Sequence, residues 1–140
     1  MSGFLLDTNV ISELLRPRPA VGVTRWLNSV DEQKLFLSAL TIGEIQKGIS
    51  LLQQSRRRDT LESWLKVDLP LRFGPRIISV NEATAIRWGR ASADAQLRGT
   101  PLSAVDGLIA STALEYGLTL VTRNVKDFAG TGVALVNPWV

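Results

Sequence analysis

Four acidic residues follow short apolar runs along the 140-residue chain. Asp7 comes directly after the run Phe4–Leu6. The other three acids come later in the chain, each beyond a further apolar run: Glu44, Asp106 and Asp127. A carboxylate at the end of a buried strand is costly unless it is paired or bound to an ion. We therefore expect Asp7 to be functional, and we expect all four acids to meet at one edge of a sheet.

Four carboxylates in one pocket raise one another's pKa values, and a bound divalent cation relieves that repulsion. The chain contains no His and no Cys, which excludes imidazole and thiolate ligands, thiol nucleophiles and disulfides. An all-oxygen site favours Mg²⁺, with Mn²⁺ as the alternative, over Zn²⁺. Such a site suits phosphodiester hydrolysis by a water that the metal activates.

Three of the acids also fit a purely structural interpretation. A residue type that caps helices stands three positions before each of Glu44, Asp106 and Asp127. These capping candidates are Thr41, Ser103 and Asn124. Acids are common in first helical turns, where they face the positive end of the helix dipole. The spacing alone leaves a capping role open for these three acids but not for Asp7.

The apolar patterning predicts strands that alternate with helices. Strands are expected at Phe4–Leu6, Leu35–Ser38, Ile77–Val80, Leu118–Thr122 and Val133–Val136. Helices are expected at Val10–Leu15, Val21–Val30, Thr41 to about Gln54, a stretch through Trp64 and Leu65, Asn81–Arg98 and Ser103–Tyr116. This alternation predicts a single α/β domain over residues 1–140, with a central parallel sheet, helices on both faces and a helical hairpin.

The formal net charge is +3 and the sequence pI is about 9.8. Arg residues dominate the basic side chains, which suits contacts with phosphate, but +3 is too small to establish a nucleic-acid substrate. The run Arg56–Arg58 near the hairpin junction fits either an RNA-guiding surface or a solvated tip. No apolar run approaches membrane-spanning length, and the first residues lack the basic stretch of a signal peptide. We expect a cytoplasmic protein that does not associate with membranes.

Four segments, taken in order, resemble the four motifs of PIN-domain nucleases. They are Phe4–Val10, Thr41–Ile49, Pro101–Ala110 and Leu120–Phe128. The ending Val136–Trp139 and the Arg-rich hairpin resemble the VapC toxins, including their FitB-like members. The resemblance implies a three-layer α/β/α PIN-like domain and a Mg²⁺-dependent endoribonuclease. It also implies the toxin of a VapBC-type, type II toxin–antitoxin system.

The resemblance assigns the metal and catalytic roles to Asp7, Glu44, Asp106 and Asp127, with Asp7 and Asp106 as direct ligands. Supporting polar positions are matched by Asn9 and Thr122, and Asn124 stands where some PIN nucleases carry another acid. Arg123, beside the expected site, is the candidate for contacting a phosphate or an antitoxin carboxylate. The implied partners are RNA, a VapB-like antitoxin whose tail blocks the site, and a second copy of the chain.

Two other functions are compatible with the same α/β class. An aspartyl-phosphate phosphatase would use Asp7 as nucleophile, but that family usually carries a second acid where this chain has Asn9, and no matching Lys is evident. A non-catalytic RNA-binding or protein-binding module would use the acids only as helix caps. Metal binding that depends on Asp7 and Asp106 separates that module from the nuclease.

Overall fold

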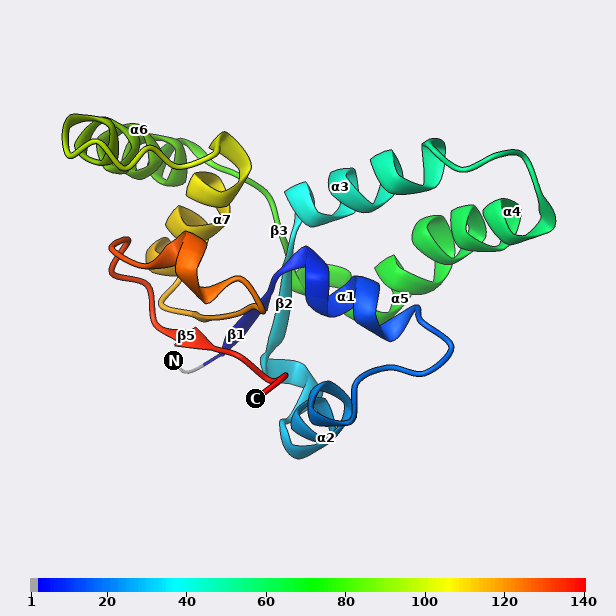
Figure 1. Cartoon of the computed structure of the whole chain (residues 1–140). Helices are drawn as coiled ribbons and strands as arrows, with labels where there is room; N and C mark the ends of the chain where they lie inside the picture. The colour runs from blue at the N-terminus through cyan, green and yellow to red at the C-terminus, as the bar shows by residue number, and fades with distance from the viewer. Residues whose placement is uncertain (1–2) are drawn as a thin grey trace.

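A five-stranded parallel sheet forms the centre of the computed structural model, which describes residues 3–140 (Figure 1). Its strands are β1 (Phe4–Leu6), β2 (Leu35–Ser38), β3 (Ile77–Ile78), β4 (Thr119–Val121) and β5 (Leu135–Val136). They lie in the order β3-β2-β1-β4-β5, and every neighbouring pair is parallel. The strand order reverses between β1 and β4, so the crevice at their carboxyl ends is where such a fold binds ligands. Met1 and Ser2, which open the segment without a signal-peptide pattern, lie outside the described residues.

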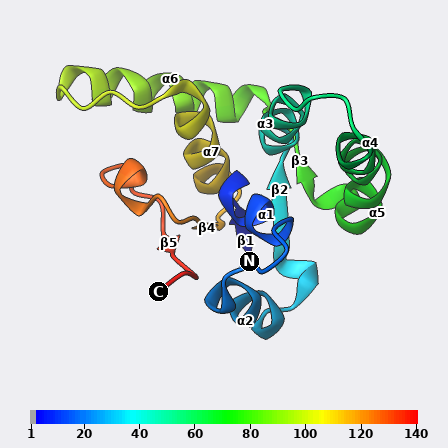
Figure 2. The ribbon, with the colours of Figure 1, turned by 45° about the vertical axis from the view of Figure 1, so that its right-hand side comes forward.

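Helices cover both faces of this sheet. Four lie on one side: α1 (Thr8–Leu14), α2 (Val21–Ser29), α3 (Ala39–Ser50) and α5 (Leu69–Phe73). α4 (Arg56–Ser63) runs back along α3 to complete the predicted hairpin, and a π-helical segment, η2 (Trp64–Asp68), leads into α5. On the other side α7 (Ala104–Glu115) packs on the strands, and α6 (Glu82–Leu97) packs against α7 (Figures 1 and 2). Three 3-10 segments complete the chain: η1 (Glu32–Lys34), η3 (Gly74–Arg76) and η4 (Val125–Phe128).

Alternating side chains on the strands supply two separate cores. Leu6 and Val121 belong to the core beneath α1, α2, α3 and α5, whereas Leu5 and Leu120 belong to the core beneath α7. Each of these four side chains is at most 1% exposed, and full burial of such a residue contributes about 1.5–3 kcal/mol. The predicted three-layer α/β/α architecture is therefore confirmed. Over residues 3–140, no helix has the length and apolar character needed to cross a membrane.

The largest difference from the predicted boundaries concerns α3. Strand β2 runs directly into this helix because the Ser38 side chain accepts a hydrogen bond from the Leu40 N–H at 3.1 Å and caps it. The helix begins at Ala39 rather than at Thr41, and it ends at Ser50. The turn after α3 is closed by the Arg58 guanidinium, whose Nη1 donates to the Leu52 carbonyl at 2.9 Å.

Candidate active site

Asp7 lies at the carboxyl end of β1, directly beside the end of β4. Its N–H donates to the Val121 carbonyl at 2.9 Å, which continues the sheet pairing for one residue beyond β1. Its Oδ1 accepts from the Thr8 N–H at 2.8 Å, and its Oδ2 accepts from the Thr122 hydroxyl at 2.8 Å. The residue is only 6% exposed. Asp7 is therefore a buried acid whose two oxygens are fixed by neighbours from both strand ends.

Burial raises the pKa of Asp7 above its ordinary value, and this is the largest influence on it. The hydrogen bonds from Thr122 and Thr8 act in the opposite direction because they stabilise the ionised form. The negative charges of Asp106 and Glu44 raise the Asp7 pKa further. Acids distant in the sequence thus act on Asp7 electrostatically, as the sequence predicted for a shared pocket.

Glu44 reaches the same place from the hairpin side. Its Oε1 accepts from the Thr8 hydroxyl at 2.5 Å, and that hydroxyl also lies 3.2 Å from Thr41 Oγ1. The expectation that Glu44 occupies the first turn of its helix is wrong, because Ser38 is the cap and α3 starts at Ala39. The capping role considered for Thr41 is wrong for the same reason, and Thr41 is instead fully buried beside Thr8.

Asp106 lies in the first turn of α7, as predicted. The Ser103 side chain accepts from the Asp106 N–H at 3.2 Å, so this serine is the helix cap. α6 approaches this turn closely, because a Cβ added at Gly107 would lie 2.9 Å from Trp88 Cδ1. Helix capping and metal binding are compatible at Asp106, because the cap uses only its backbone N–H and leaves its carboxylate available.

These three acids line one cavity of about 460 Å³, which we call the acidic pocket. It opens at the carboxyl ends of β1 and β4, the position expected from the strand order. The predicted polar side chains Asn9 and Asn124 also line it, and so does Arg123. The acidic pocket thus contains three of the four predicted carboxylates: Asp7, Glu44 and Asp106.

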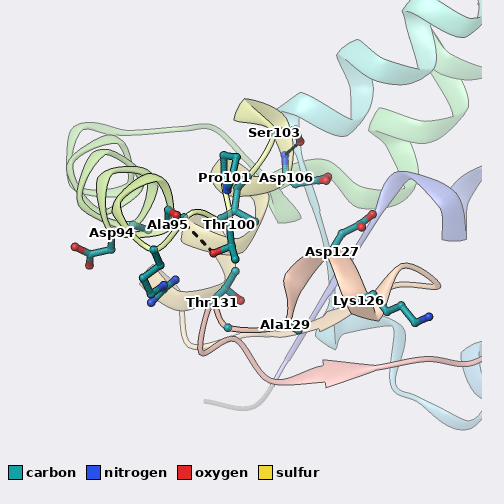
Figure 3. Close-up of a pocket in the computed structure, with 14 residues that line it drawn as sticks. Asp94, Ala95, Thr100, Pro101, Ser103, Asp106, Lys126, Asp127, Ala129 and Thr131 are labelled. Carbon is teal, nitrogen blue, oxygen red and sulfur yellow. Dashed lines mark hydrogen bonds between the residues drawn. The ribbon is translucent and has the colours of Figure 1, made fainter.

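Asp127 lies in η4 and lines a neighbouring cavity of about 500 Å³, which Asp106 also lines. Figure 3 shows the carboxylates of Asp106 and Asp127 on the same side of that cavity. The fourth acid therefore shares this neighbouring cavity with Asp106 but does not line the acidic pocket. The Asn124 side chain makes no capping hydrogen bond to η4, so the capping alternative for this pair is wrong.

The three predicted supporting residues form one hydrogen-bond network behind Asp7. Thr122 Oγ1 donates to Asp7 and accepts from Asn9 Nδ2 at 3.3 Å and from the Asn124 N–H at 3.0 Å. Asn9 Oδ1 accepts in turn from the Arg123 N–H at 3.4 Å. Since Thr122 is fully buried, its hydroxyl holds the Asp7 carboxylate in one orientation.

Sequence reasoning missed Glu13, Arg16 and Trp139, which also line the acidic pocket. Glu13 is only 6% exposed, and its carboxylate is already engaged by the Ala20 N–H at 2.8 Å and by Arg16 at 3.5 Å. Glu13 falls outside the apolar face formed by positions 10, 11, 14 and 15 of its helix, so helical periodicity gave no signal that it would be buried. Glu13 fixes the loop after α1.

Trp139 brings the end of the chain to the rim of the acidic pocket. The Arg123 guanidinium lies over its ring, 5.5 Å from the ring centroid. The segment before Trp139 runs against α2 so closely that a Cβ at Gly22 would clash with the Pro138 carbonyl oxygen. Nothing local in the sequence pairs Gly22 with residues near position 139, so this contact depends on the fold.

The donor chemistry of the acidic pocket fits a hard divalent cation. Its acids come from three different elements and are all oxygen ligands, and Asp7 is buried beside two like charges. Within residues 3–140, no group of three acidic side chains is arranged to hold an ion by itself. Mg²⁺ sites do not require such a cage, because this ion typically keeps several waters and binds one or two carboxylates together with substrate phosphates.

Comparison of the sequence with known protein families identifies the class of protein to which this fold and site belong. The family model described as "PIN domain" matches residues 4–132, so the chain belongs to the PIN-domain family. The chain is 38% identical to toxin FitB of Neisseria gonorrhoeae over 135 residues, which cover 96% of this chain and 97% of FitB. It is 30% identical to VapC ribonuclease Y4jK of Sinorhizobium fredii, with 96% of each chain covered. The resemblance to FitB-like VapC toxins is thereby confirmed.

Solved structures agree with this assignment. The crystal structure of FitAcB from Neisseria gonorrhoeae has a chain that matches with a TM-score of 0.91 and 38% identity, covering 97% of this chain and 98% of that one. A structure of VapBC-1 from nontypeable Haemophilus influenzae matches with a TM-score of 0.76 and 26% identity, covering 99% and 98%. The α/β/α fold is thus shared with toxin–antitoxin proteins over essentially the whole chain.

Proposed function

We propose that this PIN-domain protein is a Mg²⁺-dependent endoribonuclease that acts as the toxin of a VapBC-type toxin–antitoxin system. The observation that carries the proposal is the acidic pocket, in which Asp7, Glu44 and Asp106 meet at the strand-order reversal. Relatives support the reaction class: one is named VapC ribonuclease Y4jK, and a Shigella flexneri relative, 26% identical, is named tRNA(fMet)-specific endonuclease VapC.

Asp7 and Asp106 would hold the cation, with Glu44 and Asp127 completing the acidic surroundings. When bound, a divalent cation supplies a lowered pKa for the attacking water and neutralises charge at the phosphate. Glu44, fixed by the Thr8 hydroxyl and exposed to the pocket, would orient that water and accept its proton. The Thr122 hydroxyl donates to Asp7, which favours the ionised carboxylate against the effect of burial on its pKa. Arg123 at the rim would contact the RNA phosphate.

The proposed partner is an antitoxin of the VapB or FitA kind. One matching structure is that of FitAB bound to a DNA fragment, and others are structures of VapBC-1 and VapBC2. An antitoxin carboxylate reaching Arg123 would exclude RNA from the acidic pocket, so inhibition follows from occupancy of one site. The same proposal includes a homodimer and action in the cytoplasm, as the resemblance implies.

Two experiments test the proposal. Induced expression of the wild-type chain should arrest growth, and co-expression of the short reading frame next to its gene should relieve the arrest. The Asp106→Asn variant should be harmless at equal protein level. Separately, Mg²⁺ should raise the melting temperature of the wild type but not of Asp7→Asn, because only a protein that binds the ion is stabilised by it. A toxic Asp106→Asn variant, or equal stabilisation of both proteins by Mg²⁺, would contradict the proposal.

A further inference from the structure

In the second cavity, which we call the α6–α7 pocket, only Asp106 and Asp127 have a role in the reaction described above. It lies between the end of α6, the chain leading into α7, and the residues at and after η4, and it measures about 500 Å³. Figure 3 shows Asp106 and Asp127 directed toward the same side of it. Because Asp106 also lines the acidic pocket, the two cavities adjoin at this residue. Any occupant of the α6–α7 pocket therefore lies beside the proposed cleavage site.

Small residues form part of the wall of this pocket, beside the longer side chains of Asp94, Leu102 and Lys126. Ala91 and Ala95 of α6 line it, as do Ala129 and Gly130 of the segment after η4, and none of these four residues extends beyond a Cβ. A volume of about 500 Å³ with such walls is in the range of cavities that accept small flat ligands. A nucleobase is a ligand of this kind.

A single cation of α6 also lines the pocket. Arg98 caps the C-terminal end of α6 and is exposed, and its guanidinium makes neither an ion pair nor a hydrogen bond with the residues that the structure describes. Lys126 also borders the cavity, but Figure 3 shows its side chain extending away from Thr131 and Ala129. Arg98 is thus the cation available for an anionic group in the pocket, and its planar fork suits phosphate.

From this combination we infer that the α6–α7 pocket binds the nucleotide of the RNA substrate that adjoins the cut, with Arg98 pairing with the phosphate beyond it. The small walls receive the base, and Asp106 marks the side on which the scissile phosphate lies. This inference rests on the proposed ribonuclease function and extends it. It makes Arg98 a substrate-binding residue and gives the enzyme a defined place at which one nucleotide of the target can be selected.

RNA binding without cleavage tests this inference. A fluorescently labelled single-stranded RNA is titrated in EDTA with the wild type and with three variants: Arg98→Gln, Ala129→Phe and Arg90→Gln. Arg90 lies on the same helix but lines a different cavity, so it is the matched charge control. Arg98→Gln should weaken binding by about five- to ten-fold and should reduce the slope of log K against log[salt] by about 0.7, the value of one lost phosphate contact on a single strand. Arg90→Gln should change affinity by less than about two-fold.

Ala129→Phe separates the pocket from general electrostatics. It should weaken RNA binding by filling the cavity while leaving the salt slope unchanged, because no charge is removed. Equal effects of Arg98→Gln and Arg90→Gln, or wild-type affinity of Ala129→Phe, would overturn the inference.

A cleavage assay in Mg²⁺ distinguishes failure of this inference from failure of the proposed function. If the wild type cleaves RNA and Arg98→Gln binds RNA as tightly as the wild type, only the subsite is refuted. A wild type that binds through Arg98 without cleaving refutes the reaction alone, and a wild type that neither binds nor cleaves RNA refutes both.

Discussion

The Thr122 hydroxyl favours the ionised form of Asp7, and Thr122→Val removes that hydroxyl while keeping the shape of the side chain. The hydroxyl donates to Asp7 Oδ2 at 2.8 Å inside the protein, and this bond lowers the Asp7 pKa against the effect of burial. A hydrogen bond to a charged group contributes about 1.5–3 kcal/mol. Its loss favours the protonated acid, and each 1.4 kcal/mol or so shifts that equilibrium about ten-fold.

The assay is the initial rate of RNA cleavage at limiting Mg²⁺ as a function of pH. In the proposed reaction only ionised Asp7 would bind the cation, so the rate should rise with pH as Asp7 loses its proton. In the acidic range Thr122→Val should be at least roughly ten-fold slower than the wild type. In the alkaline range the two rates should converge, because Asp7 is then ionised in both proteins.

Thr84→Val is the matched control. Thr84 is also fully buried, but its hydroxyl has no hydrogen-bond partner among the described residues. Removing an unsatisfied hydroxyl should leave the pH profile unchanged and should keep or raise the stability of the fold. Coincident acid limbs for Thr122→Val and the wild type would refute the reasoning, and so would an equal shift in Thr84→Val.

Three further predictions follow from the same geometry. Burial raises the pKa of Asp7 in the folded protein, so protonated Asp7 contributes stability that is fully present below the pKa of Asp7 in the unfolded chain and is lost as pH rises through its folded-state pKa. Chemical denaturation of the wild type in EDTA should show this fall in the free energy of unfolding, and Asp7→Asn should not. Gly107→Ala pushes a Cβ to 2.9 Å from Trp88 and should cost about 1–3 kcal/mol in chemical denaturation, with a much smaller cost in a Trp88→Leu background; equal costs in both would contradict the packing argument. Trp139→Leu should raise KM for RNA because it releases Arg123, whereas Trp139→Phe should keep KM near the wild-type value because an aromatic ring still lies beneath the guanidinium. A change confined to kcat would argue against this contact.

Local patterning explains why much of the fold was predictable. The apolar runs that form β1 and β2 are bounded by polar residues, so their positions follow from the sequence. The start of α3 was placed wrongly at Thr41, because Ser38 belongs to the predicted strand and still caps the helix. Strand end and helix cap coincide at one residue, and periodicity alone does not reveal such an overlap.

The candidate site was predictable where an acid stands beside its strand. Asp7 places a charged group at the end of a buried strand, which is costly without a partner, and this made it recognisable as a functional residue from the sequence. Glu13 was missed because helical periodicity places it outside the apolar face of its helix, and Trp139 was missed because its contact with Arg123 joins two separate segments of the chain. The division of the acids between two cavities was also hidden, since sequence spacing places Asp127 after β4 but does not fix where its carboxylate points.

The most direct measurement is single-turnover cleavage of a labelled RNA, with Mg²⁺ and with EDTA, by the wild type and by Asp7→Asn, Asp106→Asn and Asp68→Asn. Asp68 is an exposed acid on the hairpin side, away from both cavities near the strand ends, and serves as the matched control. We expect cleavage by the wild type and by Asp68→Asn in Mg²⁺ only, and no cleavage above the EDTA level by the other two. Undiminished cleavage by Asp7→Asn, or full wild-type activity in EDTA, would contradict a metal-dependent nuclease built on the acidic pocket.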